Sequence, residues 1–104
     1  MKLKIGKYTW NVILVDDLFE SLGNTCFKEL TIKISKNQTK EMLKDTIFHE
    51  TMHAYIKSYG FNKEYYCEEE IVCFVTQNIN QITLLSNKIW RVIKKENNYE
   101  SNND

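Results

Sequence analysis

Residues 47–56 read Ile-Phe-His-Glu-Thr-Met-His-Ala-Tyr-Ile, and they contain the spacing His-Glu-x-x-His. It has no Gly or Pro, and apolar residues flank its histidines on both sides, so it predicts a largely buried helix. Residues four apart lie on one face of a helix, so His49 and His53 can direct their imidazoles to one point, with Glu50 beside them. The spacing His-Glu-x-x-His is typical of a zinc site.

These residue types suit zinc-dependent hydrolysis. Two neutral imidazoles bind Zn²⁺ at about 2.0–2.1 Å, and a third protein ligand leaves the fourth position to water, whose pKa the metal lowers to about 7. A carboxylate beside that water can take its proton and pass it to the leaving amine, which is the role predicted for Glu50. His49 and His53 are the only histidines of the chain, which disfavours a chance occurrence. The alternative is a helix with two ordinary histidines.

The third ligand is sought among the adjacent acids Glu68, Glu69 and Glu70 at the start of a predicted second helix. Neighbouring helical residues point about 100° apart, so at most one of the three can face the metal. Glu68 shares its face with Val72 and Ile79, which we expect to pack inward, so Glu68 is the predicted ligand and Glu69 the alternative. All three acids would also favour a helix N-terminus without binding metal.

The other segments predict an α+β fold. Residues 3–5 and 8–15 are rich in β-branched and aromatic residues and predict a hairpin around Gly6. Alternation in the second strand places Tyr8, Trp10, Val12 and Leu14 on one face, which we expect to point toward the helices. Residues 29–35 alternate strictly and predict a third strand. Residues 18–22, preceded by two Asp and followed by Gly23-Asn24, predict a short helix. The expected sheet therefore has three strands, antiparallel or mixed, packed on the helix with the histidines and on the second helix.

The helical half of the chain has recognisable boundaries. Thr39 is the predicted N-cap of the helix with the histidines, and Gly60 is its predicted left-handed C-terminal residue. The second helix is expected from about residue 64 to residue 86. A further short helix is predicted at residues 88–93, and a polar, disordered tail at residues 94–104. One domain is therefore expected over residues 1–93.

Composition restricts the classes of partner. Fourteen basic and fourteen acidic side chains cancel, so no net charge predicts a nucleic acid or an anionic membrane as partner. No secretory h-region and no stretch of membrane-spanning length is present, so a cytoplasmic protein is expected. Cys26, Cys67 and Cys73 are odd in number and widely spaced, which favours reduced thiols. Cys67 is also an alternative zinc ligand, because thiolates bind zinc well.

At these residues the chain resembles the gluzincin metallopeptidases, and most closely the small ImmA/IrrE-like and SprT-like proteins encoded by phages and mobile elements. The resemblance covers residues 8–85 and is carried by residues 32–35, 46–54 and 68–72. It implies that the active-site helix follows a short antiparallel sheet and that a second helix supplies a glutamate. The roles it implies are zinc ligands for His49, His53 and Glu68 and a general base for Glu50.

The function expected from the sequence is a zinc metallopeptidase with one Zn²⁺ per chain and a protein or peptide substrate. If the strand at residues 29–35 lies at the sheet edge, as in that family, an extended substrate could pair with it. Tyr65 and Tyr66 are candidate oxyanion stabilisers. The first alternative is a non-catalytic zinc-containing module that binds a host protein, and the second is a metal-free interaction scaffold.

Overall fold

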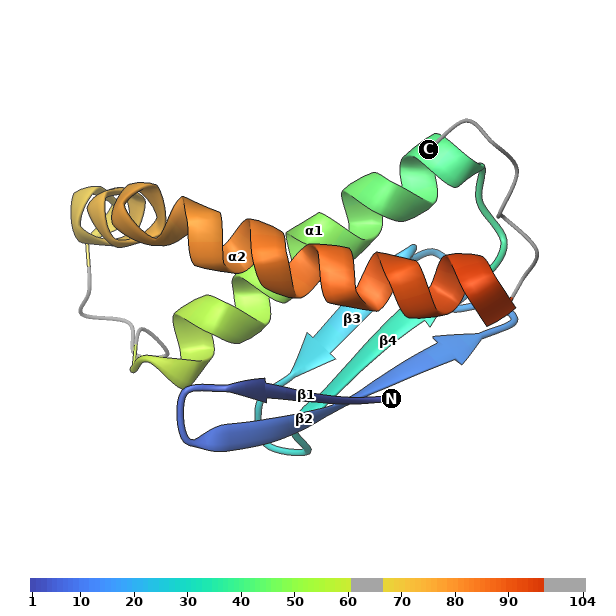
Figure 1. The fold of residues 1–104 in the computed structure, drawn as a ribbon, viewed down its shortest axis with the longest axis horizontal. Coiled ribbons are helices and arrows are strands. Elements are labelled where there is room, and N and C mark those ends of the chain that lie inside the picture. The colour runs from blue at the N-terminus through green and yellow to red at the C-terminus, as the bar shows by residue number, and fades with distance from the viewer. Residues whose placement is uncertain (61–66, 97–104) are drawn as a thin grey trace.

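The alternating strands and the two long helices form an α+β fold, described here for residues 1–60 and 67–96 of a computed structural model. Both helices lie on the same side of a four-stranded sheet (Figure 1). In chain order the elements are β1 (Lys2–Ile5), β2 (Tyr8–Val15), β3 (Gly23–Cys26), β4 (Thr31–Ser35), α1 (Lys40–Ser58) and α2 (Glu68–Glu96).

The sheet is mixed and has the strand order β1-β2-β4-β3. The predicted hairpin is confirmed, since β1 pairs antiparallel with β2. Strand β4 runs parallel to β2 and antiparallel to β3, so it lies inside the sheet. The prediction of three strands is therefore wrong by one, and the strand at residues 29–35 is not an edge strand. The edge next to it is β3, whose four residues show no apolar alternation to predict a strand.

The core lies between the sheet and the helices. Alternation along β2 turns Trp10 and Val12 inward, as predicted, while Ile13 is exposed on the opposite face. The indole Nε1 of Trp10 donates a hydrogen bond to Ser58 Oγ at 2.9 Å, which satisfies a buried polar group and joins the sheet to the end of α1. Ile32 of β4 is fully buried in the same cluster.

The segment before β3 corrects one prediction. Residues 18–22 form a tight turn and no helix: Leu18 and Ser21 are bridged, and Ser21 N donates to Leu18 O at 3.1 Å. Asp17 does not cap a helix, because its Oδ1 accepts from Phe19 N at 3.1 Å within the turn. Such local side-chain bonds compete with helix formation. Phe19 has a φ of 57° and is 95% exposed at the tip of the turn.

Helix α1 has the predicted ends. Thr39 is the N-cap, and its side chain accepts from Met42 N. Gly60 has a φ of 95°, the left-handed conformation predicted for it, and its N–H donates to Lys57 O.

Helix α2 is longer than predicted, since it runs without a break through Asn87 to Glu96 and includes the segment expected as a separate helix. Residues 94–96, predicted as the start of the tail, also belong to it, while residues 97–104 lie outside the described residues. Its 29 residues correspond to about 43 Å at 1.5 Å per residue. The longest dimension of the molecule is 42 Å, so α2 spans its whole length.

The face of α2 that packs differs from the predicted face. Val72 is 50% exposed and Ile79 is also exposed, so the face on which Glu68 was placed does not point inward. Helix α2 contacts α1 instead through Phe74 and Asn78. Its buried residues lie farther along the helix and are Ile82, Leu85, Ser86, Ile89, Trp90 and Ile93.

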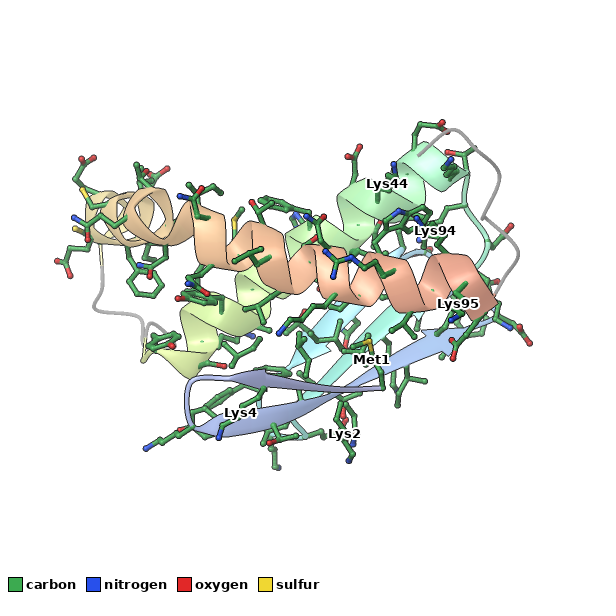
Figure 2. The ribbon with its side chains drawn as sticks, in the orientation of Figure 1. Met1, Lys2, Lys4, Lys44, Lys94 and Lys95 are labelled. Atoms are coloured by element: carbon green, nitrogen blue, oxygen red, sulfur yellow. The ribbon has the colours of Figure 1, made fainter. Side chains whose placement is uncertain are left out.

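Lysines lie both on the sheet and at the helix pair. Lys2 and Lys4 are exposed on β1, whereas Lys44 lies at the helix pair, with its Nζ 5.1 Å from the centre of the Trp90 ring (Figure 2). In the part of the chain that the structure describes, neither helix combines the length and apolar character that a membrane span requires.

Candidate metal centre

The two histidines meet on α1 as the helical spacing predicts. Their Nε2 atoms are 3.1 Å apart, and the rings are nearly perpendicular with centroids 4.7 Å apart. Two ligand atoms at 2.0–2.1 Å from a tetrahedral zinc would lie about 3.3–3.4 Å apart, so the pair needs little movement to hold one ion. The same separation suits a hydrogen bond from one neutral ring to the other. Direct measurement of zinc distinguishes these readings.

Glu50 lies beside the histidines but points toward the sheet. It is 7% exposed, and its Oε1 accepts a hydrogen bond of 2.5 Å from Thr25 Oγ1 on β3. The same hydroxyl lies 3.2 Å from the carbonyl oxygen of Glu50. In the described part of the chain, Glu50 Oε2 has no hydrogen-bond partner, so one oxygen is fixed while the other remains available.

Gly23 of β3 makes this placement sterically feasible. A Cβ at Gly23 would lie 2.7 Å from Glu50 Cγ and 2.8 Å from Thr46 Cγ2, both closer than real side chains allow. Only glycine lets α1 approach β3 so closely. Sequence reasoning missed both Gly23 and Thr25, because Gly23-Asn24 was interpreted as a helix stop.

Electrostatics favour a neutral imidazole at His53. Part of its ring is enclosed, and burial lowers its pKa from the ordinary value of 6.5. The carboxylate of Glu50 opposes this shift, while His49 and Lys57 lower the pKa further. A neutral imidazole is the form that binds a metal.

The predicted third ligand is not gathered with the histidines. Glu68, Glu69 and Cys67 are exposed at the start of α2, and among residues 1–60 and 67–96 no three His, Cys, Asp or Glu side chains are grouped so that they could hold a metal ion. Tyr65 and Tyr66, the candidate oxyanion stabilisers, lie outside the described residues.

Helix register explains the position of Glu68. Tyr55 Oη donates to Asn78 Oδ1 at 3.0 Å, and the rings of Tyr59 and Phe74 are 5.8 Å apart, so α1 and α2 pack antiparallel in a defined register. Glu68 precedes Asn78 by ten residues and His53 precedes Tyr55 by two, which places Glu68 about 18 Å from His53 along the helix axes at 1.5 Å per residue. No glutamate side chain spans that distance. The assignment of Glu68 stays a prediction, which this register does not favour.

Two open hollows flank Glu50 between α1 and β3. The first has a volume of about 470 Å³ and is lined by Glu20, Ser21, Leu22, Gly23, Asp45, Thr46, His49 and Glu50. The second has a volume of about 240 Å³ and is lined by Gly23, Asn24, Thr25, Glu50, His53 and Lys57. Asp45 and Lys57 lie four residues before His49 and four after His53. Helical spacing from the histidines could therefore have identified both.

Comparison of the chain with protein families, with curated sequences and with solved structures finds no match. The geometry around His49, Glu50 and His53 is therefore the basis for any functional argument.

Proposed function

We propose that this chain is a zinc-dependent metallopeptidase in which His49 and His53 hold the metal and Glu50 acts as general base. The observation that carries the proposal is the 3.1 Å separation of the two Nε2 atoms, close to the edge of a zinc tetrahedron. The only two histidines of a 104-residue chain occupy these positions.

The chain's own residues supply binding, orientation and proton transfer. A zinc ion bound there would polarise the substrate carbonyl and activate water. Thr25 fixes Glu50 through Oε1, which leaves Oε2 to accept a proton from the attacking water and deliver it to the leaving amine. The hydrogen bond from Thr25 thus orients the base, as catalytic carboxylates require.

The remaining metal positions need ligands other than the two histidines. We retain Glu68 as the proposed third protein ligand and Glu69 as the alternative, and both require α2 to approach α1 in a different register. Water would fill these positions if neither acid binds. The zinc content of the variants Glu68→Ala and Glu69→Ala separates these cases. Loss of zinc in one variant alone would identify that acid as the third ligand, whereas full zinc content in both would support water.

A second candidate function is a zinc-containing interaction module without catalysis. It is favoured by the burial of Glu50 and by its bond to Thr25, which also describe a carboxylate that only joins α1 to β3. In that case Glu50→Gln would lower stability and leave partner binding intact.

The test uses zinc-loaded chain and fluorescein-labelled casein as an unfolded substrate. The peptidase proposal expects wild-type chain to release labelled peptides, Glu50→Gln to bind zinc without releasing them, and His49→Ala to lose both zinc and hydrolysis. Zinc binding in wild type with hydrolysis unchanged in Glu50→Gln would exclude the general-base role. Zinc binding without any hydrolysis would favour the interaction module.

A further inference from the structure

The two hollows beside Glu50 differ in charge. The larger is lined by the acidic residues Glu20 and Asp45, and neither has a salt-bridge partner within the part of the chain that the structure describes. The smaller is lined by the basic residue Lys57. Glu50, more than nine-tenths buried, borders both, and its Oε2 has no hydrogen-bond partner among the described residues.

The hollows follow one open strand edge. In the described sheet β3 is terminal, with β4 on one side only. Ser35 N donates to Leu22 O at 2.9 Å, and hydrogen-bonded pairs alternate along an antiparallel ladder. The backbone groups of Gly23 and Thr25 therefore face away from β4. The Gly23 carbonyl already accepts from Ser21 Oγ at 2.6 Å, which agrees with that orientation.

Gly23 on the open edge of β3 connects the two hollows. Gly23 borders both hollows, so an extended chain that pairs with β3 would pass from one to the other. Backbone hydrogen bonds in this mode provide affinity, while pockets for side chains provide specificity. Helix α1 runs in the same direction as β3, from Asp45 at the larger hollow to Lys57 at the smaller.

We propose that the two hollows are side-chain subsites for an extended polypeptide on the edge of β3, and that the larger selects a Lys or Arg side chain through Glu20 and Asp45. The choice of a polypeptide as the occupant rests on the proposed peptidase function, because this polypeptide would be the substrate of the peptidase. A metal ion is a poorer occupant of the larger hollow, because no three metal-binding side chains are grouped there among the described residues. A long cationic side chain needs no such convergence.

The charge difference also sets the orientation of the polypeptide. A basic side chain in the larger hollow places the adjoining part of the polypeptide over Glu50. The side chain two residues away, which shares the same face of an extended chain, then lies near Lys57, where an acidic residue is favoured. Like charges in either position would be repelled, so the two hollows discriminate both for and against a sequence.

The experiment measures peptide binding by fluorescence polarisation, independently of hydrolysis. The probes are fluorescein-labelled, acetylated octapeptides of Ala, Val and Thr in which one position carries Lys or Glu. The protein is the full wild-type chain freed of metal, so that the proposed hydrolysis does not compete with binding. Binding of the best Lys peptide is expected to be about tenfold tighter than that of its Glu counterpart, equivalent to about 1.4 kcal/mol. In a Glu20→Lys, Asp45→Lys background the preference should reverse.

The matched control is Glu41→Lys, Glu29→Lys, which makes the same change in net charge at exposed acids that line neither hollow. The proposal is overturned if neither peptide binds, if Lys and Glu peptides bind equally, or if the control reverses the preference as fully as the Glu20, Asp45 variant. If the wild-type chain prefers the Lys peptide but binds no zinc when zinc is offered, the subsite proposal stands and the peptidase proposal is refuted.

Discussion

Gly23→Ala tests the contact between α1 and β3 without removing any reactive group. The new Cβ would lie 2.7 Å from Glu50 Cγ and 2.8 Å from Thr46 Cγ2. Carbon atoms pack best at about 3.5–4.0 Å, so the two elements must separate by about 1 Å or Glu50 must leave its position. Either adjustment disturbs the hydrogen bond between Glu50 and Thr25.

The expected cost follows from two opposing effects. Overpacking of a well-packed site costs about 1–3 kcal/mol. Replacing glycine by alanine also reduces the freedom of the unfolded chain, which returns about 0.4–1 kcal/mol at a position without left-handed backbone, as here. The net destabilisation should be about 0.5–2 kcal/mol, or a fall in Tm of about 2–16 °C at about 4–8 °C per kcal/mol.

Urea unfolding followed by circular dichroism measures this effect. Asn24→Ala is the control, because its side chain lies on the other face of β3. Adding Thr46→Ser to Gly23→Ala removes one of the two close atoms and keeps a hydroxyl for Gln38, so it should recover part of the loss. A Gly23→Ala chain as stable as wild type would refute the close approach of α1 to β3.

Three further predictions concern the same structure. Thr25→Val should lower the free energy of unfolding by about 1.5–3 kcal/mol, the range for a hydrogen bond to a charged group, measured in urea against Thr31→Val as control. Burial lowers the pKa of His53 below 6.5, so the unfolded chain binds more protons than the folded chain at acid pH. Metal-free chain should therefore be more stable above pH 6.5 and lose stability as the pH falls through the lowered pKa of His53. The substitution His53→Gln should reduce this pH dependence. Ile82→Ala should cost about 2–5 kcal/mol and Val72→Ala less than about 0.5 kcal/mol, and equal costs would contradict the packed face of α2.

Local signals in the sequence were sufficient for several elements. The alternation of residues 8–15 gave the hairpin and the inward face of Trp10, and a capping threonine with a left-handed glycine gave both ends of α1. These features depend on neighbouring residues in the chain, so no tertiary information was needed. The meeting of His49 and His53 is of the same kind, because it needs only a regular helix.

Other features depend on contacts between distant segments. The inward face of α2 is selected by Phe74 and Asn78 against two tyrosines of α1, and Val72 with Ile79 offered an equally apolar face in the sequence. The position of Glu68 follows from the same register. Strand β3 is short and polar, and its pairing depends on β4, so no periodicity predicted it or the contact of Thr25 with Glu50.

Titration of metal-free chain with zinc, followed by calorimetry, measures whether His49 and His53 bind a metal ion. Saturation is expected at about one zinc per chain for wild type and for Glu50→Gln, with binding abolished in His49→Ala and in His53→Ala. Zinc that fails to bind wild type, or that binds the two alanine variants as tightly as wild type, would contradict metal binding by these two histidines.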